Sequence, residues 1–257
     1  MSRQVSIARL RELGITPNRE LGQNFLIDDN VLGMIGALAP LEPGDVVLEV
    51  GAGLGVLTRW LAERAALVHA IEIDRRLLPA LEASLEGAEN VRVLIADAMR
   101  VDLAALEPPP QALVANLPYS VATPLIMTAL PVCRRFCVMV QREIAERLFA
   151  TPGTKAYGAV SVLVQLCCRR LGTRPVSRRV FTPVPRVDSA LVAFERRGDL
   201  VERPEWPRLA AAVRAAFAHR RKRLDNSLAL AGMQPPPPAL AALRAEQLSP
   251  EQFLELL

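Results

Sequence analysis

Asn116, Leu117, Pro118 and Tyr119 follow one another in the chain, and together they suit the recognition of a flat ring that carries an amine. The Asn116 side-chain oxygen can accept one N–H of such an amine, and a backbone carbonyl beside Pro118 can accept the other. Tyr119 offers a ring face for stacking and a hydroxyl that can stay hydrated. Adenine carries an amine of this kind. Asn and Pro are also common in turns, so these four residues alone would favour a plain strand-to-turn junction.

Apolar segments that alternate with helical patterns must position these residues. We predict strands over residues 45–50, 68–73, 91–96, 113–115 and 135–140. We predict helices over residues 31–39, 56–66, 75–85 and 123–130. This alternation is typical of an α/β fold in which a parallel sheet is covered on both faces. Ligands of such sheets bind at the carboxyl ends of the strands.

A polar residue closes each of four consecutive predicted strands: Glu49, Glu72, Asp97 and Asn116. Glu72 can accept both hydroxyls of a ribose, and Asp97 can accept an N–H from an adenine amine. Polar residues often end strands, which explains any one of them. The coincidence of four, next to a glycine-rich turn, favours a shared nucleoside site.

The glycine-rich turn, residues 51–55, joins the first of these strands to its helix. Gly51 and Gly53 allow the backbone to approach a ligand closely. The spacing is GxGxG and not the GxGxxG of dinucleotide sites, and the chain contains no GxxxxGK[ST] motif. A nucleoside cofactor without phosphates fits better than a phosphate-rich one, and S-adenosylmethionine is such a cofactor.

Composition restricts the class of protein. The 257 residues, 51% of them hydrophobic, can bury a large core, and no run is long enough to span a membrane. The amino terminus lacks a secretory signal pattern, and the four cysteines show neither zinc spacing nor a disulfide framework. We therefore expect a cytoplasmic protein without a metal, and a monomer. We predict a catalytic domain over residues 1–197 and a small helical C-terminal domain over residues 198–257, interrupted by the prolines 235–238.

Two cationic segments favour a nucleic acid partner. Residues 169–186 contain six arginines and no acid, and residues 220–223 form a second cluster. A solvated helix face would explain one such run equally well. The residues expected to contact RNA phosphates are Arg178, Arg179, Arg186, Arg220, Arg221, Lys222 and Arg223.

Several motifs in order resemble the ribosomal RNA adenine N6-dimethyltransferases. They are residues 21–26 (LGQNFL), 49–55 (EVGAGLG), 97–98 (DA), 116–119 (NLPY), 181–190 (FTPVPRVDSA) and 217–228 (FxxRRKxLxNSL). The resemblance extends from about Leu21 to Leu257 and is strongest to the bacterial small-subunit enzymes, the kasugamycin-resistance methyltransferase family. Ala52 stands where many relatives have proline. Alanine should stiffen the loop less than proline does, and the change alters no group that binds a ligand.

The resemblance implies a Rossmann-like, S-adenosylmethionine-dependent sheet and a role in small-subunit ribosome biogenesis. It implies that two adjacent adenosines near the 3′ end of the small-subunit (16S) rRNA, in a 30S precursor, each receive two methyl groups. The donor would be bound by Asn24, Leu26, Gly51, Glu72, Asp97 and Asn116, with Gly53 in the same glycine loop.

Transfer to an adenine amine requires the base to be turned out of its stack. Asn116 and the backbone at Leu117 or Pro118 would hold the amine, and Tyr119 would stack on one face of the base. Phe181 is the candidate for the other face, although it could instead be a core residue that anchors its loop. Two alternatives stay open: an adenine N6-methylase of another nucleic acid, and a ribosome-assembly factor that binds RNA without catalysis.

Overall fold

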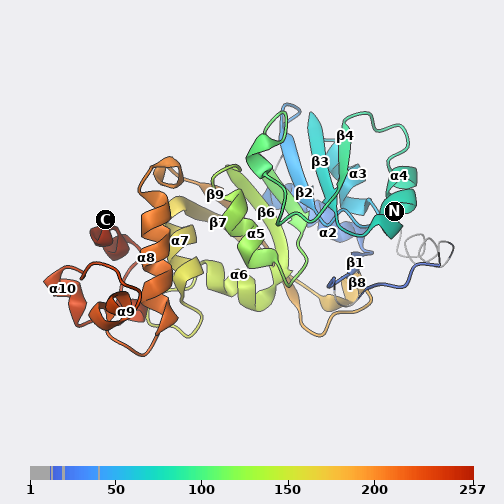
Figure 1. Cartoon of the computed structure of the whole chain (residues 1–257). Coiled ribbons are helices and arrows are strands. Elements are labelled where there is room, and N and C mark those ends of the chain that lie inside the picture. The colour runs from blue at the N-terminus through green and yellow to red at the C-terminus, as the bar shows by residue number, and fades with distance from the viewer. Residues whose placement is uncertain (1–11, 13, 19–20, 40) are drawn as a thin grey trace. The chain divides into compact units, whose positions relative to one another are not determined.

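The computed structural model of the chain describes residues 12, 14–18, 21–39 and 41–257 (Figure 1). The chain separates into two compact units. The first contains the described residues up to Arg142 together with Arg170–Glu195, and the second contains Glu143–Arg169 and Arg196–Leu257. The compact units thus join residues 143–169 to the C-terminal segment. The assignment of separate functions to residues 1–197 and 198–257 stays a prediction.

The first unit is built on a sheet with the strand order β4-β3-β2-β5-β6-β9-β7. Its parallel strands are β2 (Val46–Val50), β3 (Leu67–Glu72), β4 (Val91–Ile95), β5 (Ala112–Asn116) and β6 (Arg135–Gln141). Side chains of β2, β3, β5 and β6 are almost all buried, whereas those of the edge strand β4 alternate in exposure. All five strands lie where the sequence predicts them.

The expectation of a purely parallel sheet is wrong at one edge. β9 (Ser189–Arg196) pairs antiparallel with β6, with Gln141 opposite Ser189. β7 (Cys168–Val176) lies beyond it and exposes most of its side chains, arginines among them. β9 is as apolar as the parallel strands, so its composition does not reveal its direction. β7 and β9 are neighbours in the sheet, and a parallel arrangement of two such strands needs a crossover connection, usually an α-helix. The segment between β7 and β9 contains no α-helix.

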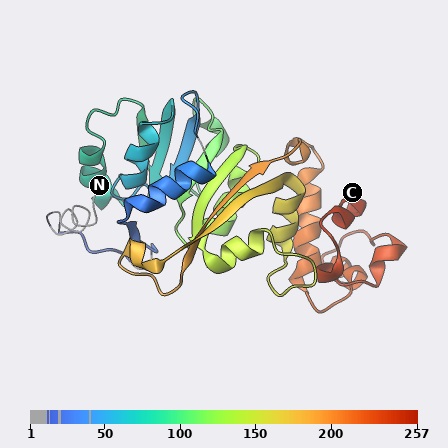
Figure 2. The ribbon, with the colours of Figure 1, turned by 180° about the vertical axis from the view of Figure 1, so that it is seen from behind.

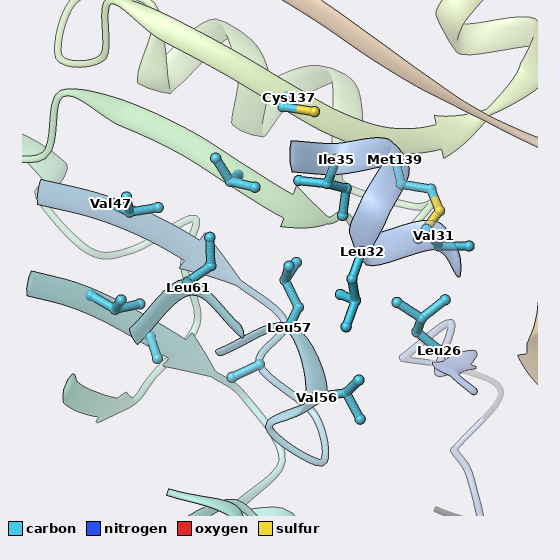
Figure 3. Packing of buried hydrophobic residues seen from close by; sticks show 14 of the residues in the cluster. Leu26, Val31, Leu32, Ile35, Val47, Val56, Leu57, Leu61, Cys137 and Met139 are labelled. Carbon is cyan, nitrogen blue, oxygen red and sulfur yellow. The ribbon is translucent and has the colours of Figure 1, made fainter. Parts of the chain in front are cut away.

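Helices cover both faces of this sheet, as expected. α2 (Asp29–Leu38) and α3 (Val56–Ala62) lie on one face and α5 (Ala122–Ala129) on the other (Figures 1 and 2). The Asp28 carboxylate caps α2 by accepting from the Asn30 N–H at 2.9 Å. Figure 3 shows the core where α2 and α3 meet the sheet, with side chains that include Val31, Leu32, Ile35, Leu57, Leu61 and Met139.

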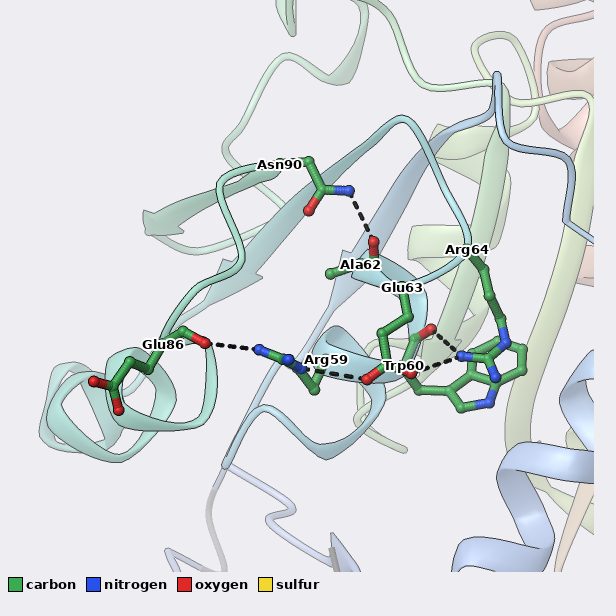
Figure 4. Close-up of polar contacts among 7 residues, drawn as sticks. All are labelled: Arg59, Trp60, Ala62, Glu63, Arg64, Glu86 and Asn90. Atoms are coloured by element: carbon green, nitrogen blue, oxygen red, sulfur yellow. Dashed lines mark hydrogen bonds and ion pairs between the residues drawn. The ribbon is translucent and has the colours of Figure 1, made fainter.

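Polar contacts fix the end of α3 that lies away from the glycine-rich turn (Figure 4). The Asn90 amide donates to the carbonyls of Ala62 at 2.8 Å and Ala65 at 2.9 Å. Arg59 donates to the Glu86 carbonyl at 2.8 Å. These bonds tie α3 to the loop before β4, at the amino ends of the strands. The carboxyl ends stay available for a site.

The second unit is helical and centred on aromatic side chains. It contains α7 (Ala159–Cys167), α8 (Trp206–Ala218), α9 (Leu224–Leu230), α10 (Pro238–Ala241) and most of α6 (Arg142–Leu148). Phe217 packs against Tyr157 and Phe253, with ring centroids 5.8 Å apart in both pairs. The Tyr157 hydroxyl donates to the Leu248 carbonyl at 2.8 Å. The proline run precedes α10, and only its last member, Pro238, enters the first turn, where no N–H is needed.

The cysteines are buried free thiols, and burial raises the pKa of Cys137 to about 12. Across the described ranges, the acids, histidines and cysteines form no cluster of three or more that could hold a metal ion. In the same part of the chain, none of the helices combines the length and apolarity that a bilayer crossing requires.

Candidate active site

One cavity of the first unit lies at the carboxyl ends of the parallel strands. Its wall comes from five segments that are distant in sequence: residues 21–26, 49–57, 71–77, 96–99 and 116–121. All four polar residues predicted to end strands line it, namely Glu49, Glu72, Asp97 and Asn116. The structure therefore brings these four residues together at one cavity, and their role in binding a ligand stays a prediction.

The glycine-rich turn brings its backbone close to the neighbouring segments of the wall. Gly51 and Gly53 have φ angles of +80° and +58°, which residues with a side chain rarely adopt. A Cβ atom on Gly53 would lie 3.3 Å from the Phe25 ring, and one on Gly51 would lie 3.5 Å from Pro118. Both positions favour glycine because of their φ angles, and Gly53 also because a Cβ atom there would crowd the Phe25 ring.

Glu72, the last residue of β3, holds the glycine turn in place. Its Oε2 atom accepts from the Gly53 N–H at 2.8 Å, and its Oε1 atom accepts from the Asp74 N–H at 2.9 Å. Burial is the main cause that raises the pKa of Glu72, and the two backbone bonds oppose it. Each carboxylate oxygen has a further lone pair, so Glu72 can still accept from a ligand hydroxyl.

Glu49, near the end of β2, has no such support. The residue is 1% exposed, and its Oε2 atom lacks a hydrogen-bond partner among the described residues. Burial raises the pKa of Glu49 to about 8, the nearby Thr58 hydroxyl opposes this rise, and the charge of Glu72 adds to it. A buried carboxyl with an unpaired oxygen in the wall of a cavity can serve a cationic ligand group.

Asp97 lies at the mouth of the cavity, two residues beyond β4. Its Oδ1 atom accepts from the Met99 N–H at 2.9 Å, which fixes a local turn. Ile73 and Met99, which are 48% and 38% exposed, also line the cavity. Sequence reasoning missed these two apolar residues. The signal available for them was their position one or two residues after an acid that ends a strand.

Asn116 ends β5 with its side-chain amide held on one side. The Nδ2 atom donates to the Asn24 carbonyl at 3.2 Å, and Asn24 in turn donates to the Gly22 carbonyl at 2.9 Å. Use of the nitrogen leaves the Asn116 Oδ1 atom as the acceptor for a ligand amine. Leu26, next in this segment, is buried and lines the same cavity.

Leu117, Pro118 and Tyr119 continue the wall beyond Asn116. The Leu117 N–H donates to the Met139 carbonyl at 3.1 Å, and the Pro118 carbonyl accepts from the Val121 N–H at 3.1 Å. The Pro118 carbonyl therefore closes a turn, which favours the Leu117 carbonyl as the second acceptor for an amine. Tyr119 is half-buried in the wall, and its hydroxyl is 2.6 Å from the Ser189 hydroxyl.

The stacking role predicted for Phe181 is wrong. Phe181 is 0% exposed, belongs to the hydrophobic core and lies outside the lining of the cavity. It pairs with Leu26 where β8 (Phe181–Thr182) meets β1 (Phe25–Leu26). The alternative, a core residue that anchors its loop, is the one observed. The sequence places an aromatic residue before a proline loop but does not determine the side to which its ring turns.

The predicted cationic residues fall into two groups. Arg178, Arg179 and Arg186 are exposed on the first unit, where Arg178 donates to the Arg186 carbonyl at 3.3 Å. Arg221, Lys222 and Arg223 are exposed on the second unit, and Arg223 pairs with Asp225 at 2.6 Å.

Arg220, another of the predicted RNA contacts, is held by hydrogen bonds inside the second unit, and its contact with RNA stays a prediction. Its Nε atom donates to the Glu246 carboxylate at 2.7 Å, and its Nη atoms donate to the Lys155 and Thr154 carbonyls at 2.8 Å each. Three of the five N–H donors of this guanidinium are thus used inside the second unit. Arg220 braces the loop before α7, whereas Arg221 carries the exposed charge.

The comparison with protein families matches a family model described as "Ribosomal RNA adenine dimethylase" over residues 15–255. The chain belongs to this family. It is 48% identical over 253 residues to "Ribosomal RNA small subunit methyltransferase A" of Rubrobacter xylanophilus, which covers 93% of this chain and 94% of the relative. A protein of the same name from Lactiplantibacillus plantarum is 40% identical over 288 residues and covers 100% of this chain and 96% of the relative.

Solved structures agree with the Rossmann-like methyltransferase fold of this dimethylase family member. A dimethyladenosine transferase from Plasmodium falciparum superposes with a TM-score of 0.75 at 26% identity, covering 91% of this chain and 96% of that chain. The 23S rRNA methyltransferase ErmE superposes with a TM-score of 0.63 at 30% identity, covering 91% and 98%. The predicted fold class and enzyme class are therefore confirmed.

Proposed function

We propose that this protein transfers methyl groups from S-adenosylmethionine to the N6 atoms of two adjacent adenosines near the 3′ end of small-subunit ribosomal RNA, giving N6,N6-dimethyladenosine. Membership of the adenine dimethylase family supports the reaction class. The names of the most similar relatives support the small subunit as substrate. The observation that carries the proposal is Asn116, whose amide nitrogen is held by Asn24 so that its oxygen is left to accept.

The residues of the cavity fit the donor. Glu72 is the acceptor for ribose hydroxyls, Asp97 for the adenine amine of the donor, and the backbone of Gly51 and Gly53 provides close approach. The unpaired oxygen of Glu49 suits a positively charged part of the donor. When bound, the donor supplies a methyl group that is attached to a cationic sulfur. The sulfur leaves as a neutral thioether when the methyl group is transferred. Asn24 and Leu26 contribute the segment that closes the other side of the cavity.

The segment 116–119 would hold the target base. In the first transfer, Asn116 Oδ1 and the Leu117 carbonyl accept the two N–H groups of the adenine amine, which keeps the amine nitrogen at a fixed place and orients its lone pair. In the second transfer, one of these acceptors holds the single N–H that remains. Tyr119 stacks on one face of the base. The amine proton is lost only as the nitrogen becomes cationic, so matched acceptors suffice and a strong base is not needed.

The substrate in the cell would be a precursor of the small ribosomal subunit, so the protein would act in ribosome biogenesis in the cytoplasm, as a monomer. The exposed cations Arg178, Arg179 and Arg186, and on the second unit Arg221, Lys222 and Arg223, would supply contacts to RNA phosphates. Such contacts position the RNA without reading its sequence, and high salt weakens them.

The direct test is methyl transfer from labelled S-adenosylmethionine to small subunits that lack these modifications, with the product nucleosides identified by mass spectrometry. The proposal requires N6,N6-dimethyladenosine near the 3′ end of the RNA. Transfer only to DNA or to large-subunit RNA would contradict the substrate and favour an adenine methylase of another nucleic acid. Donor binding without transfer to subunits or free RNA would favour an assembly factor that binds RNA.

A further inference from the structure

Ser189 contacts the candidate active site from a strand that does not line it. It is the first residue of β9, it is 0% exposed, and its hydroxyl lies 2.6 Å from the Tyr119 hydroxyl. The two residues are 70 positions apart in the chain. Sequence reasoning placed Ser189 only in the 181–190 motif and assigned it no role.

The strand that carries Ser189 is well fixed. Gln141 of β6 lies opposite Ser189, and Met139 of β6 lies opposite Leu191. Met139 is also the residue whose carbonyl accepts from the Leu117 N–H, two residues before Tyr119. The backbone that leads to Tyr119 and the tip of its ring are therefore held by two paired strands of one sheet.

The hydroxyl contact supplies a restraint that the backbone cannot. An aromatic side chain rotates about two bonds beyond Cα, so a fixed backbone leaves the plane of its ring undetermined. A hydrogen bond at the far end of the ring restricts rotation about the Cα–Cβ bond directly. Because a phenolic hydroxyl prefers to bond in the plane of its ring, the same bond also favours one orientation of the ring plane. Tyr119 is only half-buried, so packing alone restricts its ring less than it would in a core.

A serine at a fully buried position also needs a reason. A buried hydroxyl is unfavourable unless it is hydrogen-bonded, and alanine would occupy the same place without that requirement. For Ser189 the partner is a side chain of the cavity wall. Ser227, a buried serine of α9 in the second unit, has no partner among the described residues and provides a matched comparison.

We infer that Ser189 is a positioning residue: its hydroxyl holds the far end of the Tyr119 ring and favours one orientation of the ring plane, so that the ring is already oriented for the target adenine when the RNA binds. This inference rests on the proposed function, because the proposed function is what assigns the Tyr119 ring to stacking on the target base. Burial raises the pKa of Tyr119, against the smaller lowering effect of the Ser189 hydrogen bond, so the phenol keeps its proton and one of the two hydroxyls donates to the other.

The test compares Ser189→Ala, Tyr119→Phe and the double variant in steady-state methyl transfer to under-methylated small subunits. Each single variant should lower kcat/KM for the RNA about tenfold, the effect of one hydrogen bond, while the affinity for the donor changes less than about twofold. The double variant should be no worse than either single one, because both remove the same bond. Additive losses, or a Ser189→Ala enzyme with unchanged kcat/KM, would overturn the inference.

Ring orientation has its own readout. An RNA with 2-aminopurine at the target position keeps a purine face, and its fluorescence is quenched when the base stacks on a tyrosine. Quenching should be weaker in Ser189→Ala than in wild type, whereas Ser227→Ala should match wild type in both quenching and kcat/KM. Equal quenching in Ser189→Ala and wild type would contradict a positioning role.

Thermal unfolding of each variant separates loss of position from loss of fold. If Ser189→Ala does not fold, Tyr119→Phe still tests the inference, because it keeps the ring and Ser189 and removes only the bond. Tyr119→Phe with full activity and full quenching would then refute it. Failure of the wild-type enzyme to methylate RNA would instead refute the proposed function, so the two failures are distinguishable.

Discussion

The ends of β3 and β5, where Glu72 and Asn116 line the cavity, differ in how far the protein satisfies the polar atoms of these two side chains. On the donor side, Glu72 is buried and both of its oxygens already accept from backbone N–H groups of Gly53 and Asp74. On the base side, Asn116 is held only through its nitrogen, and its oxygen is left open. The first arrangement fixes the glycine-rich turn through the carboxylate, and the second leaves an acceptor free for the amine of the proposed substrate.

The largest effect is expected on the base side. Asn116→Ala should lower the turnover number about 10²–10³-fold, because it removes an acceptor aimed at the reacting amine. Binding of the donor, measured by calorimetry, should stay within a few-fold of wild type. Asn30→Ala, which removes an exposed amide from α2, is the control and should leave turnover unchanged. Full turnover in Asn116→Ala would eliminate the amine clamp and with it the contrast between the two sides.

Glu72→Ala should show the opposite pattern. The dissociation constant of the donor should rise about 10- to 100-fold, since hydrogen bonds to a charged group are lost. The melting temperature should also fall, because the buried N–H groups of Gly53 and Asp74 lose their acceptor. Glu82→Ala, at an exposed site on α4 (Leu78–Ser84), controls for loss of charge alone. An unchanged donor affinity in Glu72→Ala would refute the ribose assignment.

Glu49 gives a pH-dependent prediction for the same side. Its pKa is raised from 4.5 to about 8, so between these values the folded protein holds a proton that the unfolded chain releases. The contribution of Glu49 therefore makes the donor-free protein less stable as the pH rises from about 4.5 to about 8. Glu49→Gln should remove this contribution, so its melting temperature should exceed that of wild type by an amount that grows with pH.

The affinity for the donor tests the same residue with a ligand present. A cationic group next to Glu49 favours the ionised carboxylate, so donor binding should release a proton and tighten as the pH rises toward 8. Calorimetry of wild type in buffers of different ionisation enthalpy measures that proton. The same proton release in Glu49→Gln would show that another group titrates.

The smallest effects are expected in the cationic cluster of the second unit. Arg220 is bonded inside the protein and Arg221 is exposed, so the two residues also differ in how far the protein uses their donors. Arg220→Ala should lower the melting temperature, because the bonds to Glu246 and to two carbonyls are lost. Arg221→Ala should leave it unchanged and weaken RNA binding by a few-fold, with the slope of log affinity against log salt reduced by about one. RNA binding that falls equally in a stable Arg220→Ala would reverse these assignments.

Much of the site follows from the sequence alone. The strands, the glycine-rich turn and the acids or amide near the strand ends can be located from hydrophobic runs and the residues that interrupt them. Because parallel strands align their carboxyl ends, local positions in the chain translate directly into a shared cavity. The convergence of Glu49, Glu72, Asp97 and Asn116 needed no knowledge of long-range packing.

Tertiary structure alone decided what depends on side-chain direction and on partners distant in the chain. The ring of Phe181 turns into the core, Ser189 meets Tyr119, Arg220 braces a loop and β9 runs antiparallel. An aromatic residue, a serine or an arginine reads the same in sequence whether it faces solvent or a neighbour. The choice between the two is made by packing of segments that the chain connects only through folding, so no local pattern encodes it.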